Sequence, residues 1–506
     1  MKLLGKTLLA LLSLVLLASV SLWLFTKNMQ PETIKRFVAQ QISAITHKES
    51  QINGAISWQF FPNPSLKIQK IQIGSNNQKE NYNATINSLV FNLKLTPLLK
   101  GSLLFDELAI DGLQLQVNQN APKETVAINN QNKNSKTSSH KEFAIQKITL
   151  SHSQIAINNN GEQTLLKNVQ VAVEDFNLQS HSFPIQIKTR LNKLNNNTKI
   201  KANISFTGRL NLNDSIRNDL SKGLFIPAVE GQLLLQNLVF NQIAIDKIST
   251  TIKTNKENLE FNPLTVSLYD GEAVGTMNYA LNTRQISLNQ TATNLDGKKL
   301  ITALLGEQII SGTMDYSIHA NFPSDSFSLK SFLGNGQITL KEGTLYGVNI
   351  DELLNHLKGK LTQVMNGDLS NMSSLSDLNK NQLTQGNTAF KLASVDYQLK
   401  NEQLSTNSLI LQTDKLQIKG DGTINLDNRT MNSKLQVTIN NNDETMQKIQ
   451  SLVGGYFPLT VSGTIEHPNI SPDFKTISPL LGQMLTNPKL QKPLKFLGKQ
   501  LKGLIR

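Results

Sequence analysis

Seven histidines are the first residues to consider as metal ligands or as general acids and bases, and they are scattered along the chain. They stand at His47, His140, His152, His181, His319, His356 and His467. Their spacing does not match that of zinc ligands, and the metalloprotease pattern His-Glu-x-x-His does not occur. The sequence contains no cysteine, which excludes cysteine nucleophiles, thiolate ligands and disulfides. We therefore predict that the protein has no metal site.

Paired carboxylates and glycine-rich runs are the other motifs that could carry enzyme chemistry. Glu174-Asp175 and Asp351-Glu352 are sequence neighbours that need not converge on a substrate, and we interpret them as solvated turn or helix-start residues. The runs 334–336 and 420–422 extend into neither a P-loop nor a dinucleotide fingerprint, and we interpret both as turns. The sequence thus predicts no catalytic residue, no cofactor-binding residue and a protein that is not an enzyme.

An uncharged apolar run from Thr7 to Thr26 stands near the N-terminus. A helix of this length rises about 30 Å, one hydrocarbon thickness, so we expect a transmembrane anchor over residues 1–28. The alternative is a cleaved signal peptide, whose apolar core is about 7–15 residues long and ends at a small-residue site. Here the small residues around Ala18 run straight back into Leu22. Lys2 and Lys6 favour a cytoplasmic N-terminus and an exported body.

The body of the chain has the apolar period of β-strands. After a helix expected from Pro31 to about His47, apolar residues alternate with polar ones over most of the sequence. Helical spacing returns at 300–309 and 350–364, and Asp421-Gly422 and Asp427-Asn428 favour turns. We predict a mainly β fold of antiparallel strands with one apolar face, interrupted by a few short helices. Candidates for the apolar lining are Leu113, Leu115, Val117, Val169, Val171, Val173, Leu233, Leu235, Leu435, Val437 and Ile439.

The C-terminal tail concentrates positive charge. The last 32 residues hold seven Lys or Arg and no Asp or Glu, in a chain whose formal net charge is +13. On a helical wheel the leucines gather opposite the cations, which predicts a basic amphipathic helix suited to an anionic membrane surface. The alternatives are a helix packed on its own domain and a nucleic-acid contact, and the second would need interleaved aromatic residues, of which the tail offers only Phe496. The tail residues concerned are Leu494, Lys495, Leu497, Lys499, Leu501, Lys502 and Arg506.

Four segments resemble the bacterial AsmA family in the order that the family has. They are 52–62 (INGAISWQFFP), 95–101 with 108–112 (LTPLLKG and LAIDG), 343–351 (GTLYGVNID) and 457–465 (FPLTVSGTI). The Gly-Arg pair that many relatives carry near His47 is missing here. With these segments the chain divides into an anchor (1–28), an N-terminal AsmA-like region (29–117), a polar linker (118–140), a middle β region (141–330), a C-terminal AsmA-like region (331–475) and the basic tail (476–506).

The resemblance implies a single-pass protein of the Gram-negative inner membrane with its body in the periplasm. It also implies an elongated antiparallel β-groove made of a curled sheet and a role in phospholipid transfer and outer-membrane lipid homeostasis, with phospholipid as cargo and its identity open. From the residues themselves we expect no cofactor and no nucleic-acid partner. A further envelope protein could bind the tail. The alternating pattern alone fits a closed β-sandwich core equally well. The alternative function is a structural or chaperone-like factor for outer-membrane protein assembly, which would hold polypeptide on the same apolar face.

Overall fold

The computed structural model describes most of the body of the chain. The described residues are 31–46, 48–59, 64–74, 81–94, 105–118, 144–159, 162–177, 181–194, 198–212, 228–254, 258–324, 329–365, 386–440, 444–452 and 454–473. The expected anchor (1–28), nearly all of the polar linker and the basic tail (476–506) lie outside them. Within the ranges above, no helix is long and apolar enough to cross a membrane.

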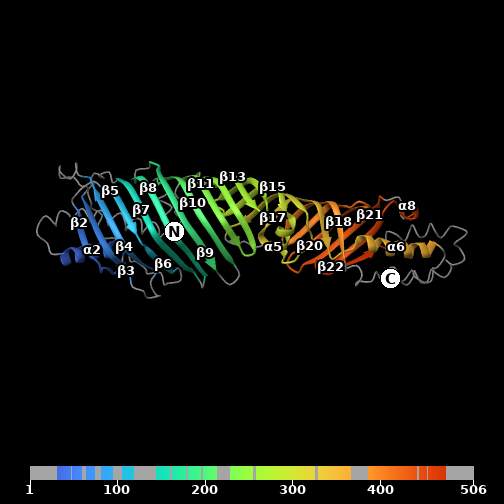
Figure 1. Cartoon of the computed structure of the whole chain (residues 1–506), viewed down its shortest axis with the longest axis horizontal. Coiled ribbons are helices and arrows are strands. Elements are labelled where there is room, and N and C mark those ends of the chain that lie inside the picture. Colours follow the sequence, from blue (N-terminus) through green and yellow to red (C-terminus); the bar gives the residue numbers. More distant parts are fainter. Residues whose placement is uncertain are drawn as a thin grey trace. The chain divides into compact units, whose positions relative to one another are not determined.

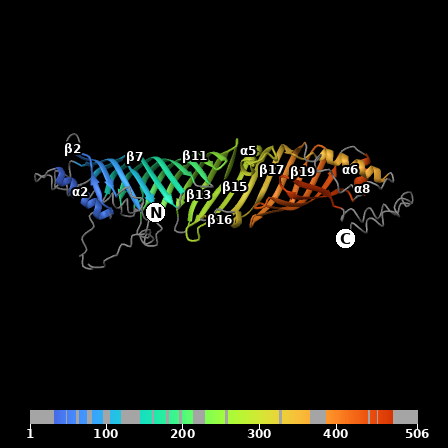
Figure 2. The same cartoon turned by 90° about the horizontal axis from the view of Figure 1, so that it is seen from below.

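The chain divides into two compact units. Unit 1 ends at Leu264 and unit 2 begins at Thr265, so that β13 (Asn258–Leu268) crosses the division. Each unit consists mainly of long strands with a few short helices (Figures 1 and 2). The expectation of a mainly β fold is confirmed.

Unit 1 starts with helix α2 (Pro31–Thr46), where the sequence predicts it. Its strands are β1 (Ser50–Ile52), β2 (Ile56–Gln59), β3 (Ser65–Ile73), β4 (Tyr82–Leu93), β5 (Phe105–Asp111), β6 (Gln114–Asn118), β7 (Ala144–Asn159), β8 (Glu162–Asn177), β9 (Phe183–Leu194), β10 (Lys199–Asn211), β11 (Ala228–Phe240) and β12 (Ile243–Thr254).

The strands of unit 1 follow one another in the sheet as they do in the sequence. At two places in the sheet, two short strands lie end to end beside one long strand. Strands β1 and β2 both pair with β3, and strands β5 and β6 both pair with β4. From β7 to β12 every neighbouring pair is antiparallel.

One pairing in unit 1 corrects the sequence-based expectation of an antiparallel sheet. Strands β5 and β6 run parallel to β7, with Leu108 opposite Ile148 and Leu115 opposite Ile155. A parallel pair needs a long connection, because the chain must return to the end at which it started. The 25 residues between Asn118 and Ala144 supply that length. Alternation of apolar residues carries no information about strand direction, so the sequence pattern could not reveal this pair.

Unit 2 is an antiparallel meander, and within the described residues three α-helices lie between its strands. The strands are β14 (Gly271–Ala280), β15 (Gln285–Asp296), β16 (Thr313–Pro323), β17 (Leu333–Tyr346), β18 (Asn387–Lys400), β19 (Gln403–Gln412), β20 (Leu416–Asn425), β21 (Thr430–Ile439), β22 (Phe457–Thr464) and β23 (Pro468–Pro472). Helices α5 (Gly297–Leu305) and α6 (Ile350–Met365) occupy the two segments with helical spacing and confirm that prediction. A short 3₁₀ turn (Leu329–Ser331) and helix α8 (Glu444–Leu452) were not predicted.

The two glycine-rich runs lie inside strands, so their interpretation as turns is wrong. Gly334 and Gly336 belong to β17, and Gly420 and Gly422 belong to β20. A Cβ atom at Gly336 would lie 1.9 Å from the carbonyl oxygen of Ser317. Glycine is present there because neighbouring backbone comes too close for a side chain. The turn predicted at Asp427-Asn428 is confirmed, and it joins β20 to β21.

Each unit has one buried apolar cluster beside its helices. In unit 1, Val38 and Ile42 of α2 are buried together with residues of β3 and β4. The end of α2 is fastened by hydrogen bonds from the Tyr82 hydroxyl to the Thr46 carbonyl oxygen and from the Ser50 amide to the Ser43 hydroxyl. In unit 2, Ile350 and Leu354 of α6 and Met446 of α8 are buried against β20, β21 and β22.

Candidate functional site

One face of the sheet in unit 1 carries apolar side chains in register from strand to strand. Residues directly opposite each other in neighbouring strands share a face. The register joins Ile68, Leu89, Ile110, Leu150, Val171, Ile187, Phe206 and Leu233 in one row across β3, β4, β5, β7, β8, β9, β10 and β11. These eight residues define the apolar face of unit 1.

The apolar face is covered at one end and open further along. Ile68 and Leu89 are 1% and 0% exposed beside α2, whereas Leu150 and Val171 are only half-buried. A group of half-buried apolar residues on β8 to β12 lies outside the buried cluster altogether, and we call this group the open strip. It consists of Leu166, Leu191, Ile200, Ile204, Leu235, Leu238, Phe240, Ile243, Ile245 and Ile248.

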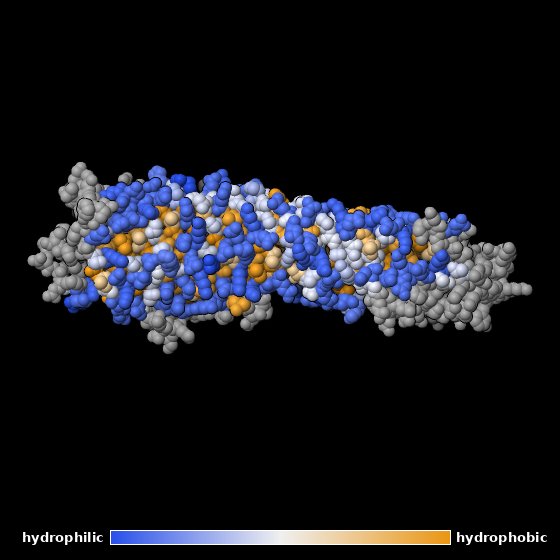
Figure 3. All heavy atoms as spheres, viewed as in Figure 1, coloured by the Kyte–Doolittle hydropathy of each residue, from blue (hydrophilic) through white to orange (hydrophobic). Residues whose placement is uncertain are grey.

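The open strip is continuous across its strands. Leu166 lies opposite Leu191, Ile204 lies opposite Leu235, and Leu235 lies opposite Ile248. Nearer the strand ends, Phe240 lies opposite both Ile200 and Ile243. Hydrophobic residues reach the surface among hydrophilic ones over the strands of unit 1 (Figure 3). A contiguous apolar patch of this kind indicates a binding surface for an apolar partner.

Two paired glycines lie on the apolar face beside the open strip. Gly208 and Gly231 are paired on β10 and β11, and a Cβ atom on either would lie within 3 Å of the Phe206 ring. The ring therefore covers both glycines.

The opposite face of the same strands is polar and basic. Lys167 lies opposite Arg190, Arg190 lies opposite Asn203, and Gln236 lies opposite Lys247. All of these side chains are exposed. A sheet that is apolar on one face and charged on the other has a defined binding side.

Unit 2 also has an apolar face that is covered by helices at one end. One row joins Tyr316, Ile338, Val395 and Leu409, which are half-buried. The neighbouring row runs through Leu411 and Ile418 to Val437 and Phe457, and its last members are buried beneath α6 and α8. The backbone amide of Ile439 donates a hydrogen bond of 2.7 Å to the Gln450 side chain of α8. Here too the apolar face passes from a covered end to a half-exposed stretch.

The predicted lining residues fall into different environments. Leu113 and Val117 pack against the core of unit 1, and Leu115, Val169 and Val173 are buried. Val171, Leu233, Leu235 and Leu435 are half-buried. Val437 and Ile439 are 0% and 5% exposed, so a ligand could reach them only if α8 moved. The two predicted sets on β8 and β11 share the apolar face of unit 1, and the set on β21 belongs to unit 2.

Most of the open strip was not among the predicted residues. Ile243 and Ile245 follow strand alternation along β12, and this signal was available in the sequence. The alternation breaks between Ile245 and Ile248, beside Asn237, which has a positive φ of 52° on the neighbouring strand. Such an irregularity shifts the side-chain period and hides the pattern.

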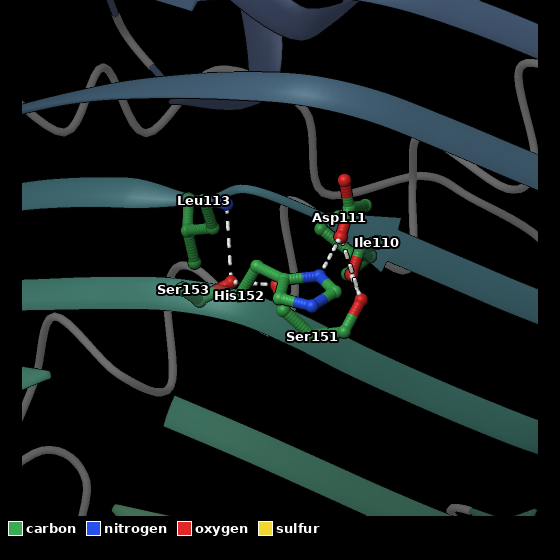
Figure 4. A network of polar contacts seen from close by, with 6 residues as sticks. All are labelled: Ile110, Asp111, Leu113, Ser151, His152 and Ser153. Atoms are coloured by element: carbon green, nitrogen blue, oxygen red, sulfur yellow. Dashed lines mark hydrogen bonds and ion pairs between the residues drawn. The ribbon is translucent and has the colours of Figure 1, made fainter. Parts of the chain in front are cut away.

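A cluster of Asp, His and Ser between β5 and β7 has the residue types of a catalytic triad but not its geometry (Figure 4). The Ser151 hydroxyl and the His152 ring both bond to the Asp111 carboxylate, at 2.8 and 2.6 Å, and no bond joins the Ser151 hydroxyl to the ring. These contacts hold the pKa of Asp111 below its usual value, chiefly through His152. Ser153, which is 1% exposed, accepts a hydrogen bond from the Leu113 amide at the break between β5 and β6. The cluster stabilises the parallel pairing of β5 and β6 with β7.

No group of three His, Asp or Glu side chains that could hold a metal ion occurs in the part of the chain that the structure describes.

The family comparison agrees with the segments recognised in the sequence. Residues 1–223 match the model of the AsmA family. This N-terminal part belongs to the AsmA family. The AsmA match spans α2 and β1 to β10 and includes Val169, Val171 and Val173, whereas Leu233 and Leu235 lie beyond its end. The resemblance of the segments 343–351 and 457–465 also lies beyond it and stays a prediction. No curated protein matches the chain significantly.

Proposed function

We propose that the protein binds the acyl chains of phospholipids on the apolar face of its sheet and takes part in moving lipid within the bacterial envelope. The observation that carries this proposal is the open strip, a continuous apolar surface that the described residues do not cover. Membership of the AsmA family for residues 1–223 supports it, because the family is associated with the envelope.

The energetics of lipid transfer explain why such a surface is useful. An acyl chain of about sixteen carbons costs on the order of 0.8 kcal/mol per CH₂ when it enters water. An apolar strand face removes the chain from water, and the headgroup stays in contact with the solvent. Acyl chains are also compatible with a face that lacks polar specificity, since the strip offers mostly Ile, Leu and Phe side chains.

The half-buried state of the strip favours a groove over a closed sandwich. A closed core would bury Leu235, Ile245 and Ile248 as fully as it buries Ile68 and Leu89. An ordinary sandwich pairs two sheets and hides both inner faces. In unit 1 the residues beside α2 are buried under that helix, and those of the open strip are only half-buried.

The proposed function also requires contact with membranes. We propose that residues 1–28 anchor the protein in the inner membrane, that the body lies in the periplasm, and that residues 476–506 contact a membrane surface or an envelope partner. We also propose that the protein is not an enzyme and needs no cofactor. A chaperone-like role would use the same strip to hold unfolded outer-membrane polypeptide, and the experiment below separates it from lipid binding.

Lipid analysis of the purified full chain tests the proposal. The protein would be extracted from membranes in mild detergent, and bound phospholipid would be quantified by mass spectrometry. We expect bound phospholipid in the wild type and about a tenfold loss in the double variant Leu235→Lys, Ile248→Lys, because a charge in the strip opposes an acyl chain.

The matched control is Gln236→Lys, on the opposite face of β11, which should retain wild-type amounts of lipid. Absence of lipid from the wild type, or equal retention by all three proteins, would show that the strip does not bind acyl chains. Crosslinked unfolded polypeptide in place of lipid would favour the chaperone-like role.

A further inference from the structure

A small polar cluster interrupts the apolar face of unit 2. Gln290 of β15 lies opposite Ile318 of β16 and opposite Gly275 of β14. Tyr316 of β16 lies opposite Ala292 of β15, two residues along the strand from Gln290 on the same face. Gln290 and Tyr316 thus stand among apolar and small residues of this face.

The hydroxyl groups of the two tyrosines near Gln290 are desolvated and donate hydrogen bonds. The Tyr316 hydroxyl donates a hydrogen bond of 3.2 Å to the Gln290 side-chain oxygen. The hydroxyl of Tyr397, from β18, donates one of 3.2 Å to the carbonyl oxygen of Ser317. Burial raises the pKa of Tyr316 and raises the pKa of Tyr397 to about 12, so that both hydroxyls are neutral at physiological pH.

The amide nitrogen of Gln290 is buried and has no hydrogen-bond partner among the described residues. Turning the amide over does not remove the defect, because Tyr316 can satisfy one end and the other end would then be without a partner. A buried polar group without a partner costs about 1–3 kcal/mol, and such groups are rare in native proteins. A leucine at position 290 with a phenylalanine at position 316 would remove both the hydrogen bond and the unpaired nitrogen at lower cost on an apolar face. Because Gln290 as a whole is only half-buried, a turn of its flexible side chain brings the unpaired donor to the surface of the face, where a ligand can supply the acceptor.

We propose that the side-chain amide of Gln290 donates a hydrogen bond to an ester carbonyl of a glycerophospholipid whose acyl chains lie along the apolar face of unit 2. The inference rests on the proposed function and specifies its ligand, because the esters are the acceptor oxygens nearest to the acyl chains of a diacyl lipid. Free fatty acids carry no ester, and an alkane carries no acceptor at all. The cluster thus selects a class of lipid that an apolar surface alone would not distinguish.

A comparison of ester-linked and ether-linked lipids tests this directly. The ether analogue has the same chains and headgroup and lacks the two carbonyl oxygens. Retention of each lipid by the purified full chain in detergent would be measured by mass spectrometry for the wild type and Gln290→Leu. We expect the wild type to retain the ester-linked lipid about fivefold to tenfold better than the ether-linked one, and the variant to show no preference.

Thermal unfolding of lipid-free protein adds an independent readout. The double variant Gln290→Leu, Tyr316→Phe should be at least as stable as the wild type, because it removes both partners of the hydrogen bond together with the unpaired amide nitrogen. A residue with a structural role would instead lower the melting temperature when replaced. The matched control is Gln398→Leu, at an exposed position of β18, which should keep the wild-type preference for esters.

The outcomes separate this inference from the proposed function. Equal retention of ester-linked and ether-linked lipid by the wild type would overturn the role of Gln290 and leave acyl-chain binding intact. Retention of neither lipid would overturn both. Recovery of polypeptide in place of lipid, with a loss on Gln290→Leu, would show that the amide binds peptide carbonyls and would also overturn the inference.

Discussion

Gly208 and Gly231 lie directly opposite each other on β10 and β11, under the ring of Phe206. A Cβ atom at Gly231 would lie 2.5 Å from the Gly208 Cα and 2.8 Å from the tip of the ring. We predict that Gly231→Ala lowers the free energy of unfolding by about 2 kcal/mol, because backbone and ring would both have to move. Urea unfolding of the purified protein would measure the change.

Gly359 of α6 provides the control for that substitution. It is exposed, and an added Cβ atom would meet nothing within 4 Å. Gly359→Ala should be neutral or stabilise by up to about 1 kcal/mol, because alanine is the better helix former. If the two variants were equally stable, the close approach at Gly231 would be refuted.

The carboxylate of Asp315 joins β16 to both of its neighbours. It accepts hydrogen bonds from the Lys341 ammonium at 2.7 Å and from the Asn294 amide at 2.9 Å, and these hold its pKa below the usual 3.8. A lowered carboxyl pKa stabilises the fold above about pH 4, and the contribution is lost as the pH falls through the folded-state value. We predict that Asp315→Asn costs about 1 kcal/mol at pH 7 and that the difference from the wild type shrinks as the pH falls below about 4.

Melting temperatures measured from pH 7 down to pH 2 would check the prediction for Asp315. The control is Asp427→Asn in the exposed turn between β20 and β21. A difference between Asp315→Asn and the wild type that stayed constant over the whole range would show that the charge is not responsible.

Ser153 supports the parallel pairing of β5 and β6 with β7. Its buried hydroxyl accepts from the Leu113 amide at 3.0 Å and donates to the Ser151 carbonyl at 2.8 Å. Ser153→Ala should lower the free energy of unfolding by about 1–3 kcal/mol, because the Leu113 amide would lose its partner. Chemical denaturation would measure this, with Ser324→Ala at an exposed position as the reference. A cost below about 0.5 kcal/mol would contradict the account of the junction.

Gln450 holds α8 over the covered end of the apolar face in unit 2. Its side-chain oxygen accepts a hydrogen bond from the Ile439 amide, beside the buried Val437 and Phe457. Gln450→Leu should loosen α8 and expose these residues, so we predict increased fluorescence of the apolar dye ANS at 25 °C. Gln403→Leu, at an exposed position of β19, should leave dye binding unchanged. Equal fluorescence of both variants would mean that α8 stays in place without this bond.

Local patterns in the sequence were enough to predict the helices with clear spacing. Alternation and helical spacing gave α2, α5 and α6 because each buries one apolar stripe, as Val38 and Ile42 do in α2. Helix α8 was missed because only three of its residues are apolar, Met446, Ile449 and Leu452, whereas α5 of the same length is richer in leucine. The glycines at 420 and 422 were misread because glycine is needed both in turns and where strands approach closely, and the sequence does not distinguish the two.

The candidate site depended on information that is not local. Alternation correctly placed Val169, Val171 and Val173 on one face. It could not tell that Val437 is covered by helices while Leu235 is half-exposed, because coverage depends on elements distant in sequence. The parallel pairing of β5 and β6 with β7 likewise depends on residues distant in sequence, so alternation could not predict it.

Photocrosslinking at Leu235 tests the central claim most directly. A photoreactive amino acid would replace Leu235 in the open strip, Gln236 on the opposite face of the same strand, or Val437 under α8. After irradiation of intact cells, crosslinked phospholipid would be counted by mass spectrometry. We predict strong capture of phospholipid at position 235 and little at positions 236 and 437. Equal capture at 235 and 236, or capture of polypeptide alone at 235, would contradict the account.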